Sequence, residues 1–169
     1  YKSDKFYLVS TTDRQKVLEI AKKEHINGVL AYASDPAAPT AAYVAEELRL
    51  PSNSYTSVQI LCNKDLFRKF LLENGFSAPE AQAYFSPEEA IIDKANFDYP
   101  IIIKPVDSSG SKGVTVLESG SNIEKALDFA FSFSRCHRII VEHYIEKKHP
   151  YLVGGDIFVK DGKIVLWGL

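Results

Sequence analysis

Residues 99–116 read YPIIIKPVDSSGSKGVTV, and the rest of the chain can be interpreted around this stretch. The three β-branched residues at 101–103 predict a buried strand. Lys104 closes that strand, and Pro105 ends it because proline has no backbone N–H to donate. Residues 107–113 are mostly small or hydroxyl-bearing, and residues 114–117 start a second strand. We therefore expect a hairpin with a polar tip.

A tip of this composition can fold over a polyphosphate, because glycines let the backbone approach and amide and hydroxyl groups donate to phosphate oxygens. Lys104 would then place a fixed positive charge beneath the phosphates. The loop alone is explained equally well as a solvated hairpin with one lysine reaching solvent. A P-loop is excluded because Lys112 precedes Gly113 and a strand follows. A kinase-type loop is excluded because the glycines of a kinase loop precede the strand lysine, whereas here Lys104 precedes the glycines.

Composition and charge narrow the class of protein. The 169 residues are 46% hydrophobic and 25% charged, which is enough for a core in one domain or in parts of two. The net charge of -2 gives no excess of basic residues that would indicate nucleic-acid binding. No apolar run approaches the length of a membrane span. Cys62 and Cys136 are the two cysteines and fit a reducing, cytoplasmic location. Because the sequence begins at Tyr1 without methionine and ends within an apolar strand pattern, we expect a fragment of a longer protein.

The first sixty residues alternate between strand and helix patterns. Strands are predicted at residues 6–9 and 29–32, and helices at residues 13–24 and 37–48. This order predicts parallel βαβ units, as in the later part of a Rossmann-like domain. Thr11, Thr12 and Asp13 are predicted to cap the first helix. The loop after residue 32 follows a strand end, where open α/β sheets bind ligands, but we favour helix capping as the role of Ser34 and Asp35.

The remaining patterns are a basic helix, the central hairpin and further strands. The helix at residues 63–73 carries Lys64, Arg68 and Lys69 on its polar side, which by itself indicates a solvated face. Asn74 and Gly75 are expected to end it. We also predict a strand at 79–85, helices at 86–94 and 121–133, the second capped by residues 121–124, and strands at 137–141, 151–153, 156–160 and 163–167.

The order of these patterns is more specific than any one of them. A basic helix is followed by a strand ending in Lys104 and Pro105, a serine–glycine loop, a helix, the strand end VEHYI at 141–145, and a hairpin with the Asp161-Gly162 turn. This order resembles the ATP-grasp superfamily of carboxylate–amine ligases, in particular the group of the carbamoyl phosphate synthetase large subunit and biotin carboxylase. The resemblance covers residues 61–169, and the part before it is similar to that group's pre-ATP-grasp domain.

The resemblance implies an α/β fold, in which a partial Rossmann-like pre-ATP-grasp domain is followed by an incomplete ATP-grasp α+β domain. The expected division is a pre-ATP-grasp part at 1–61, a linking helix at 62–78, a small lid subdomain at 79–136, and the truncated start of a second subdomain at 137–169.

The resemblance also implies a nucleotide site. Lys104 would contact the α-phosphate side of ATP, Ile102 would pack on the adenine, and Lys64 resembles the family's first ATP-facing basic residue. The phosphate lid would consist of Ser108, Ser109, Gly110, Ser111, Lys112 and Gly113.

The strand end at 142–145 would hold the base. Glu142 would accept from the adenine amino group through its carbonyl, which leaves its side chain free to be a surface acid. The backbone N–H of Ile145 would meet the ring nitrogen, and Tyr144 would pack beside the purine or in the core. His143 stands where the family commonly has an acidic or a basic residue. The family's ribose-binding acid should follow Glu142 by a few residues, but the resemblance does not assign it to one position. The candidates lie in residues 146–150 and at Asp156.

By resemblance, the protein uses ATP to phosphorylate a small-molecule carboxylate, and an amine or other nucleophile then displaces the phosphate. Mg2+ would be the metal, with its ligands beyond Leu169, so this fragment alone is expected to be inactive and to hold no catalytic side chain. A homo-oligomer is compatible with this reading, and nucleic-acid or membrane partners are not expected. A non-catalytic nucleotide-binding or regulatory module is the alternative. A Rossmann oxidoreductase is disfavoured because no Gly-x-Gly-x-x-Gly motif occurs.

Overall fold

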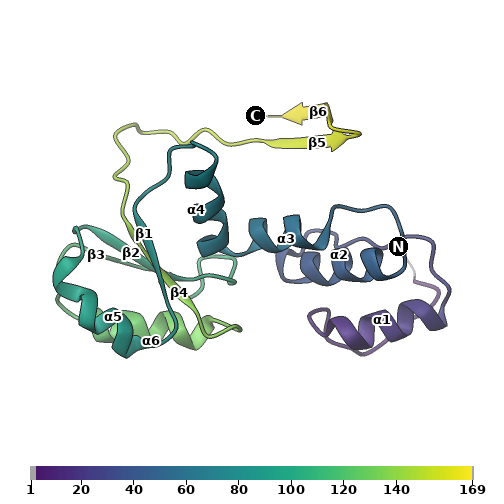
Figure 1. Ribbon diagram of the computed structural model, residues 1–169, viewed down its shortest axis with the longest axis horizontal. Coiled ribbons are helices and arrows are strands. Elements are labelled where there is room, and N and C mark those ends of the chain that lie inside the picture. The colour runs from purple at the N-terminus through teal and green to yellow at the C-terminus, as the bar shows by residue number, and fades with distance from the viewer. Residues whose placement is uncertain (1–2, 169) are drawn as a thin grey trace.

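The computed structural model describes residues 3–168, which form a helical N-terminal group, a four-stranded sheet with its helices, and a separate hairpin (Figure 1). None of the described helices is long and apolar enough to cross a membrane. The helices are α1 (Arg14–Lys23), η1 (Asp35–Ala37), α2 (Ala38–Glu47), α3 (Tyr55–Cys62), α4 (Lys64–Glu73), α5 (Pro87–Ile92), η2 (Asp93–Asn96) and α6 (Ile123–Phe133). The strands are β1 (Ala81–Tyr84), β2 (Ile101–Pro105), β3 (Thr115–Leu117), β4 (Ile139–His143), β5 (Asp156–Lys160) and β6 (Lys163–Gly168).

The N-terminal group is built from α1, α2 and α3. The predicted cap of α1 is confirmed at Asp13, whose carboxylate accepts from the Lys16 N–H at 3.2 Å. Leu18 and Ala21 of α1 pack against Val44 of α2 in a small buried cluster. Helix α3 was not predicted; the Ser54 hydroxyl begins it by accepting from the Ser57 N–H.

The two strands predicted in this group are wrong. Residues 6–9 and 29–32 pair with no strand within the described range, and a strand needs such a partner for its backbone hydrogen bonds. Their alternating apolar side chains remain exposed: Phe6, Leu8, Leu30 and Tyr32 are each more than three-quarters accessible. The two helices of the predicted βαβ pattern are therefore present without its sheet.

The sheet has the strand order β1-β4-β2-β3, and every neighbouring pair is antiparallel. Helices α5 and α6 cover one face, and α4 lies on the other side (Figure 1). The core between the sheet and α5 and α6 contains Ile101, Ile103, Leu127, Ile139 and Val141. Strand β4 lies inside the sheet, so the sheet continues past residue 136, where we expected the lid subdomain to end.

Most of the predicted helix ends are confirmed. The Ser86 hydroxyl accepts from the Glu89 N–H, and the Glu89 carboxylate accepts from the Phe85 N–H. Gly75, at φ 75°, follows α4, and the Phe76 N–H donates to the Leu71 carbonyl, as in a Schellman ending. The cap predicted for α6 is wrong, because Asn122 adopts φ 62° and its side chain makes no capping bond.

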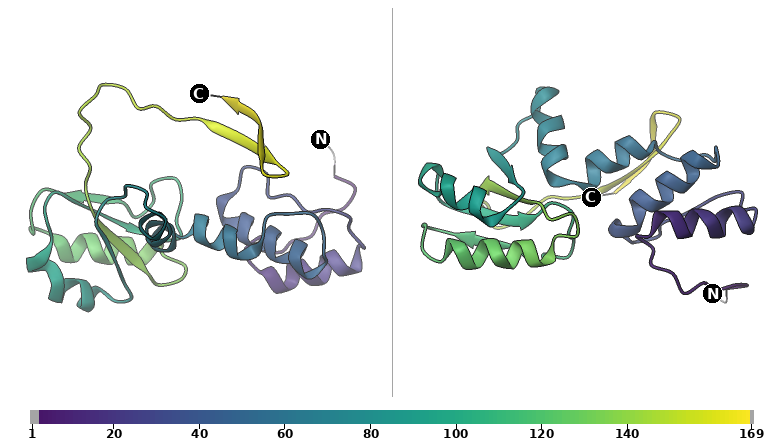
Figure 2. Two further views of the ribbon diagram at one scale, coloured as in Figure 1. Left: turned by 45° about the horizontal axis from the view of Figure 1, so that its top comes forward. Right: turned by 60° about the horizontal axis from the view of Figure 1, so that its bottom comes forward.

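Strands β5 and β6 form a hairpin around Asp161 and Gly162, which both have positive φ as a two-residue hairpin turn requires. The strand predicted at 151–153 is not formed. The hairpin is not part of the four-stranded sheet, and Figure 2 shows it at the end of a long linker, away from that sheet. Its apolar side chains are exposed on both faces, Trp167 at 67% among them.

Candidate functional site

The strand register places three predicted site residues on one face of the sheet. Ile102 pairs directly with Glu142 across β2 and β4, and Lys104 pairs with Ile140. Paired residues and residues two apart share a face, so Ile102, Lys104 and Glu142 point to the same side, opposite α5 and α6. Val116 pairs with Ile102 and is 38% exposed, so this face is open over β2 and β3.

A buried cluster of charges occupies this open face. The Lys104 ammonium lies 2.5 Å from one carboxylate oxygen of Glu142, and the Arg68 Nε lies 2.9 Å from the other. The side chains of Lys104 and Glu142 are only 15% and 3% exposed. The surface-acid interpretation of Glu142 is therefore wrong, and Arg68 was missed as a member of the site. In the sequence, Arg68 lies on the polar side of its helix, and that pattern does not indicate which neighbouring element the side chain contacts.

The second oxygen of Glu142 is only partly satisfied. Although this Oε1 atom is close to the Arg68 Nε, the two atoms lack the alignment of a hydrogen bond, and both are buried without another partner in the described structure. A buried carboxylate oxygen in this state can still accept a hydrogen bond from a ligand.

Helix α4 is held to the sheet by a second set of polar contacts. Arg138, just before β4, lies 3.1 Å from the Asp65 carboxylate and donates to the Asn63 side chain at 3.2 Å. Asn63 is 8% exposed and also donates to the Gln59 carbonyl at the end of α3. These contacts fix the start of α4, and with it Lys64, against the sheet.

Lys64 lies at the base of the predicted lid. Its backbone N–H donates to the Val106 carbonyl at 3.0 Å, and its ammonium donates to the Ser108 carbonyl at 2.7 Å. Burial, and next the positive charge of Lys104, lower the pKa of the Lys64 ammonium. Two neighbouring positive charges favour an anion between them.

The lid loop is firmly held at its root. The Asp107 carboxylate accepts from the Ser134 hydroxyl at 3.2 Å and from the backbone N–H groups of Arg135 and Cys136 at 3.3 and 3.0 Å. The Arg135 guanidinium also lies 3.5 Å from this carboxylate. Asp107 was not predicted as a site residue, and only its position directly before the serine–glycine run pointed to it.

The lid tip is exposed and contains an unusual backbone. Gly110 and Ser111 both have positive φ, and they and Lys112 are exposed. Gly113, at φ 72°, is buried, and an added Cβ would lie 2.8 Å from Pro105 and 3.0 Å from Phe133. The tip can therefore move while its two ends are fixed, which fits a lid.

The end of β4 continues the open face only in part. The Tyr144 N–H donates to the Pro100 carbonyl and the His143 N–H to the Glu80 carbonyl, so the ladder continues through these residues. By the alternation of an antiparallel ladder, the carbonyl of Glu142 then faces β2 and Ile102. The His143 ring turns to Asp98, with Nδ1 3.1 Å from its carbonyl. Ile145 is 68% exposed, and Asp156 lies in the separate hairpin.

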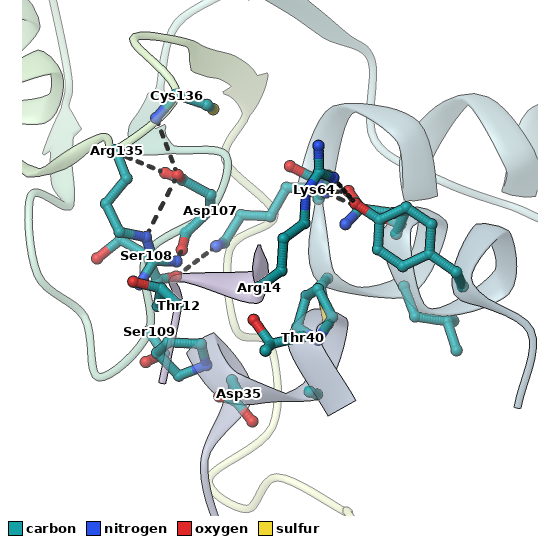
Figure 3. A pocket seen from close by; sticks show the side chains of 18 residues that line it. Thr12, Arg14, Asp35, Thr40, Lys64, Asp107, Ser108, Ser109, Arg135 and Cys136 are labelled. Carbon is teal, nitrogen blue, oxygen red and sulfur yellow. Dashed lines mark hydrogen bonds and ion pairs between the residues drawn. The ribbon is translucent and has the colours of Figure 1, made fainter. Parts of the chain in front are cut away.

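A cavity of about 730 Å³ lies between the N-terminal group and the root of the lid (Figure 3). Arg14, Asp35 and Thr40 line it from the N-terminal side, and Lys64 and Ser108 from the sheet side. The predicted capping role of Ser34 is wrong, because its side chain makes no capping bond and Asp35 lies at this cavity. Within residues 3–168, no group of three or more His, Cys, Asp or Glu side chains could hold a metal ion.

Comparison with known proteins agrees with this geometry. Residues 78–150 match the family model described as the D-ala D-ala ligase C-terminus. The carbamoyl phosphate synthase large chain of Thermotoga petrophila is 27% identical over 165 residues, which are 96% of this chain and 15% of that protein. The resemblance to the ATP-grasp superfamily is confirmed. The residues matched by the family model include β1 to β4, the loop at 108–113, and both Lys104 and Glu142.

Solved structures show the same ATP-grasp fold. An L-amino acid ligase from Bacillus licheniformis superposes with a TM-score of 0.64 at 23% identity, covering 79% of this chain and 31% of that one. A phosphoribosylglycinamide synthetase from Anaerococcus prevotii gives a TM-score of 0.59 at 13% identity, covering 98% and 40%. The chain thus shares the mixed helix-and-sheet fold of ATP-grasp ligases, and it spans a minor part of each relative's length.

Proposed function

We propose that this chain forms the nucleotide-binding part of an ATP-dependent ligase that joins a small-molecule carboxylate to an amine or a related nucleophile. The observation that carries the proposal is the buried Lys104–Glu142–Arg68 cluster on the open face of the sheet, next to the lid root at Lys64. Burying charges costs free energy, and a cluster of buried charges beside an open surface is a candidate ligand-binding site.

The cationic end of this face would hold the phosphates. Lys104 rises from a strand, so little conformational entropy is lost when it meets a phosphate. Lys64 lies near Lys104, and its other contacts are to backbone carbonyls. The hydroxyl and amide groups of residues 108–113 would close over the phosphates from the lid. These groups neutralise negative charge in a site that lid closure shields from water.

The other end would hold the adenine. Ile102 offers an apolar surface between Lys104 and Val116. We place the adenine amino group at the Oε1 of Glu142, which lies 2.9 Å from the Arg68 Nε without an aligned hydrogen bond, because the carbonyl of that residue faces β2 within the ladder. Ile145 follows the last ladder bond, and its amide remains the proposed donor to the ring. His143 turns away to Asp98, Tyr144 would pack beside the purine, and Asp156 remains a candidate for the ribose.

The bound ATP would supply the phosphoryl group that converts the carboxylate into an acyl phosphate. The residues of this chain would bind and orient the nucleotide, and the closed lid would keep water from the reactive intermediate. Mg2+ would balance phosphate charge, with ligands outside residues 3–168. We place the reaction in the cytoplasm.

The test is phosphate release by the full-length protein with ATP and a panel of carboxylates, each with and without an amine. Release that requires both substrates, with formation of the joined product, is the expected result. ATP binding without any turnover would favour the non-catalytic nucleotide-binding module instead. Absence of ATP binding would refute both.

A further inference from the structure

Arg68 reaches the open face of the sheet from α4. Its Nε lies 2.9 Å from the Oε1 of Glu142, and its side chain is 22% exposed. Glu142 is its one ion-pair partner within residues 3–168, and Asp65, an acid on the same helix, pairs with Arg138 instead at 3.1 Å. Any effect of Arg68 on the site is therefore transmitted through the Glu142 carboxylate.

The contact between Arg68 and Glu142 is an attraction of charges and not a hydrogen bond. The Nε and Oε1 atoms are both buried, and neither has a hydrogen-bond partner in the described structure. A hydrogen bond weakens steeply when it is bent, whereas the attraction between two charges depends on their distance. Arg68 can therefore hold Oε1 in place while the lone pairs of that oxygen stay available to another donor.

Two cations fix the Glu142 carboxylate, one at each oxygen. Lys104, on β2, lies 2.5 Å from Oε2, so Oε1 is the oxygen that Arg68 positions. Arg68 itself is placed by α4, whose start is held to the sheet through the contact of Asp65 with Arg138. Without Arg68, the carboxylate would be free to turn both oxygens towards Lys104, and Oε1 would lose its fixed direction.

The direction of Oε1 matters because an ionised carboxylate accepts hydrogen bonds and donates none. The amino group of adenine is a donor and satisfies this oxygen. Hypoxanthine carries an oxo group at the same position, which would bring two acceptors together and leave Oε1 buried without a partner. A site built to receive a donor rejects an analogue that lacks it, because the buried polar group of the site then stays unpaired.

We propose that Arg68 is a positioning residue for base selection: it holds Oε1 of Glu142 at the place where this oxygen accepts from the adenine amino group and excludes purines with an oxo group there. Arg68 acts through Glu142 and does not itself contact the nucleotide. The inference rests on the proposed function, because it assumes that adenine lies at Oε1, and it adds the residue that gives the site its choice of base.

The test is titration calorimetry with ADP and IDP, since IDP has the oxo group in place of the amino group. In wild type we expect ADP to bind about 30-fold more tightly, and in Arg68→Met this preference should fall to about threefold. IDP also carries a hydrogen on the neighbouring ring nitrogen, but that difference is the same in every variant. A merely structural loss would weaken ADP and IDP alike and leave their affinity ratio unchanged.

Two further variants make the comparison specific. Arg68→Lys restores the positive charge and should keep the ratio within about threefold of wild type. Lys69→Met is the matched control, because it removes a charge from the next position of α4, where the side chain is 71% exposed and pairs with Glu73. It should leave the ratio unchanged.

A second measurement uses only the wild-type site and does not depend on the folding of Arg68→Met. The Arg68 Nε–H resonance is assigned in heteronuclear NMR spectra by its absence from Arg68→Lys. ADP should shift this resonance, because the adenine amino group shares Oε1 with the Arg68 Nε. IDP should shift it less than half as far at saturation, because it brings no donor to that oxygen.

The outcomes separate this inference from the proposed function. An ADP-to-IDP ratio that is equal in wild type and folded Arg68→Met, or an Arg68 resonance that both nucleotides shift equally, would overturn the role of Arg68 and leave the nucleotide site intact. Equal affinity for ADP and IDP in wild type would do the same. Absence of binding by either nucleotide would refute the proposed function and this inference with it.

Discussion

Replacing Lys104 by methionine should destabilise the fold as well as weaken nucleotide binding. Lys104 is the 2.5 Å partner of a Glu142 carboxylate that is 3% exposed, so this buried pair needs the charge of the lysine. Removing it leaves a buried negative charge with one partner instead of two.

The magnitude follows from the remaining contact. Breaking a buried ion pair typically costs about 3–5 kcal/mol when the other charge is left alone. Arg68 stays 2.9 Å from Glu142 and limits the cost here, so we expect about 2–3 kcal/mol. For a chain of this length, that lowers Tm by roughly 4–12 °C.

The assay is urea unfolding followed by far-UV circular dichroism, because Trp167 lies in the exposed hairpin and would report poorly on the sheet. Lys112→Met, on the exposed lid tip, is the control and should stay within about 0.5 kcal/mol of wild type. Adding Glu142→Gln to Lys104→Met should recover part of the loss, since the buried charge is gone. A Lys104→Met protein as stable as wild type, or a double variant whose losses simply add, would refute the buried-pair argument.

Three further predictions concern the lid and its root. Gly113→Ala should cost about 1–3 kcal/mol more than Gly110→Ala, because both have positive φ but only the Gly113 Cβ would collide with Pro105; equal Tm shifts would contradict this. Burial and Lys104 lower the pKa of Lys64, so the unfolded chain binds more protons at this site than the folded chain as the pH rises towards 10.5. The free energy of unfolding of wild type relative to Lys64→Met should therefore rise as the pH approaches 10.5, and a difference that stays constant with pH in urea unfolding would count against it. Asp107→Asn should lower the free energy of unfolding by about 1–3 kcal/mol and speed hydrogen exchange at the Cys136 N–H, which donates to the Asp107 carboxylate. Unchanged exchange would show that Asp107 does not hold the lid root in place.

The sequence allowed the strands of the sheet and the loop between β2 and β3 to be predicted because the patterns there are local. β-branched residues ending at Lys104 and Pro105, the capped helix at Ser86 and the Asp161-Gly162 turn each follow from short-range chemistry. The strands at residues 6–9 and 29–32 failed for the opposite reason. Their apolar alternation is genuine, but a strand also depends on a neighbour that the pattern itself does not contain.

The charge cluster could be predicted only in part. Lys104 and Glu142 were expected at the site, but their direct contact depends on the register between β2 and β4, which lie far apart in the chain. Arg68 was assigned to a solvated face, since helix periodicity says nothing about a buried acid opposite it. Arg14 and Thr40 carried no motif, and their cavity appears only when the N-terminal helices and the lid root are placed together.

The central claim is that ATP lies on the open sheet face against Lys104, and the affinity for a non-hydrolysable ATP analogue tests it most directly. The measurement compares wild type, Lys104→Met and Lys112→Met by titration calorimetry at a temperature where circular dichroism shows all three folded. We predict that Lys104→Met binds about 10- to 100-fold more weakly, as for the loss of a charge-assisted contact, and that Lys112→Met changes affinity about threefold or less. An unchanged affinity in folded Lys104→Met would contradict the account.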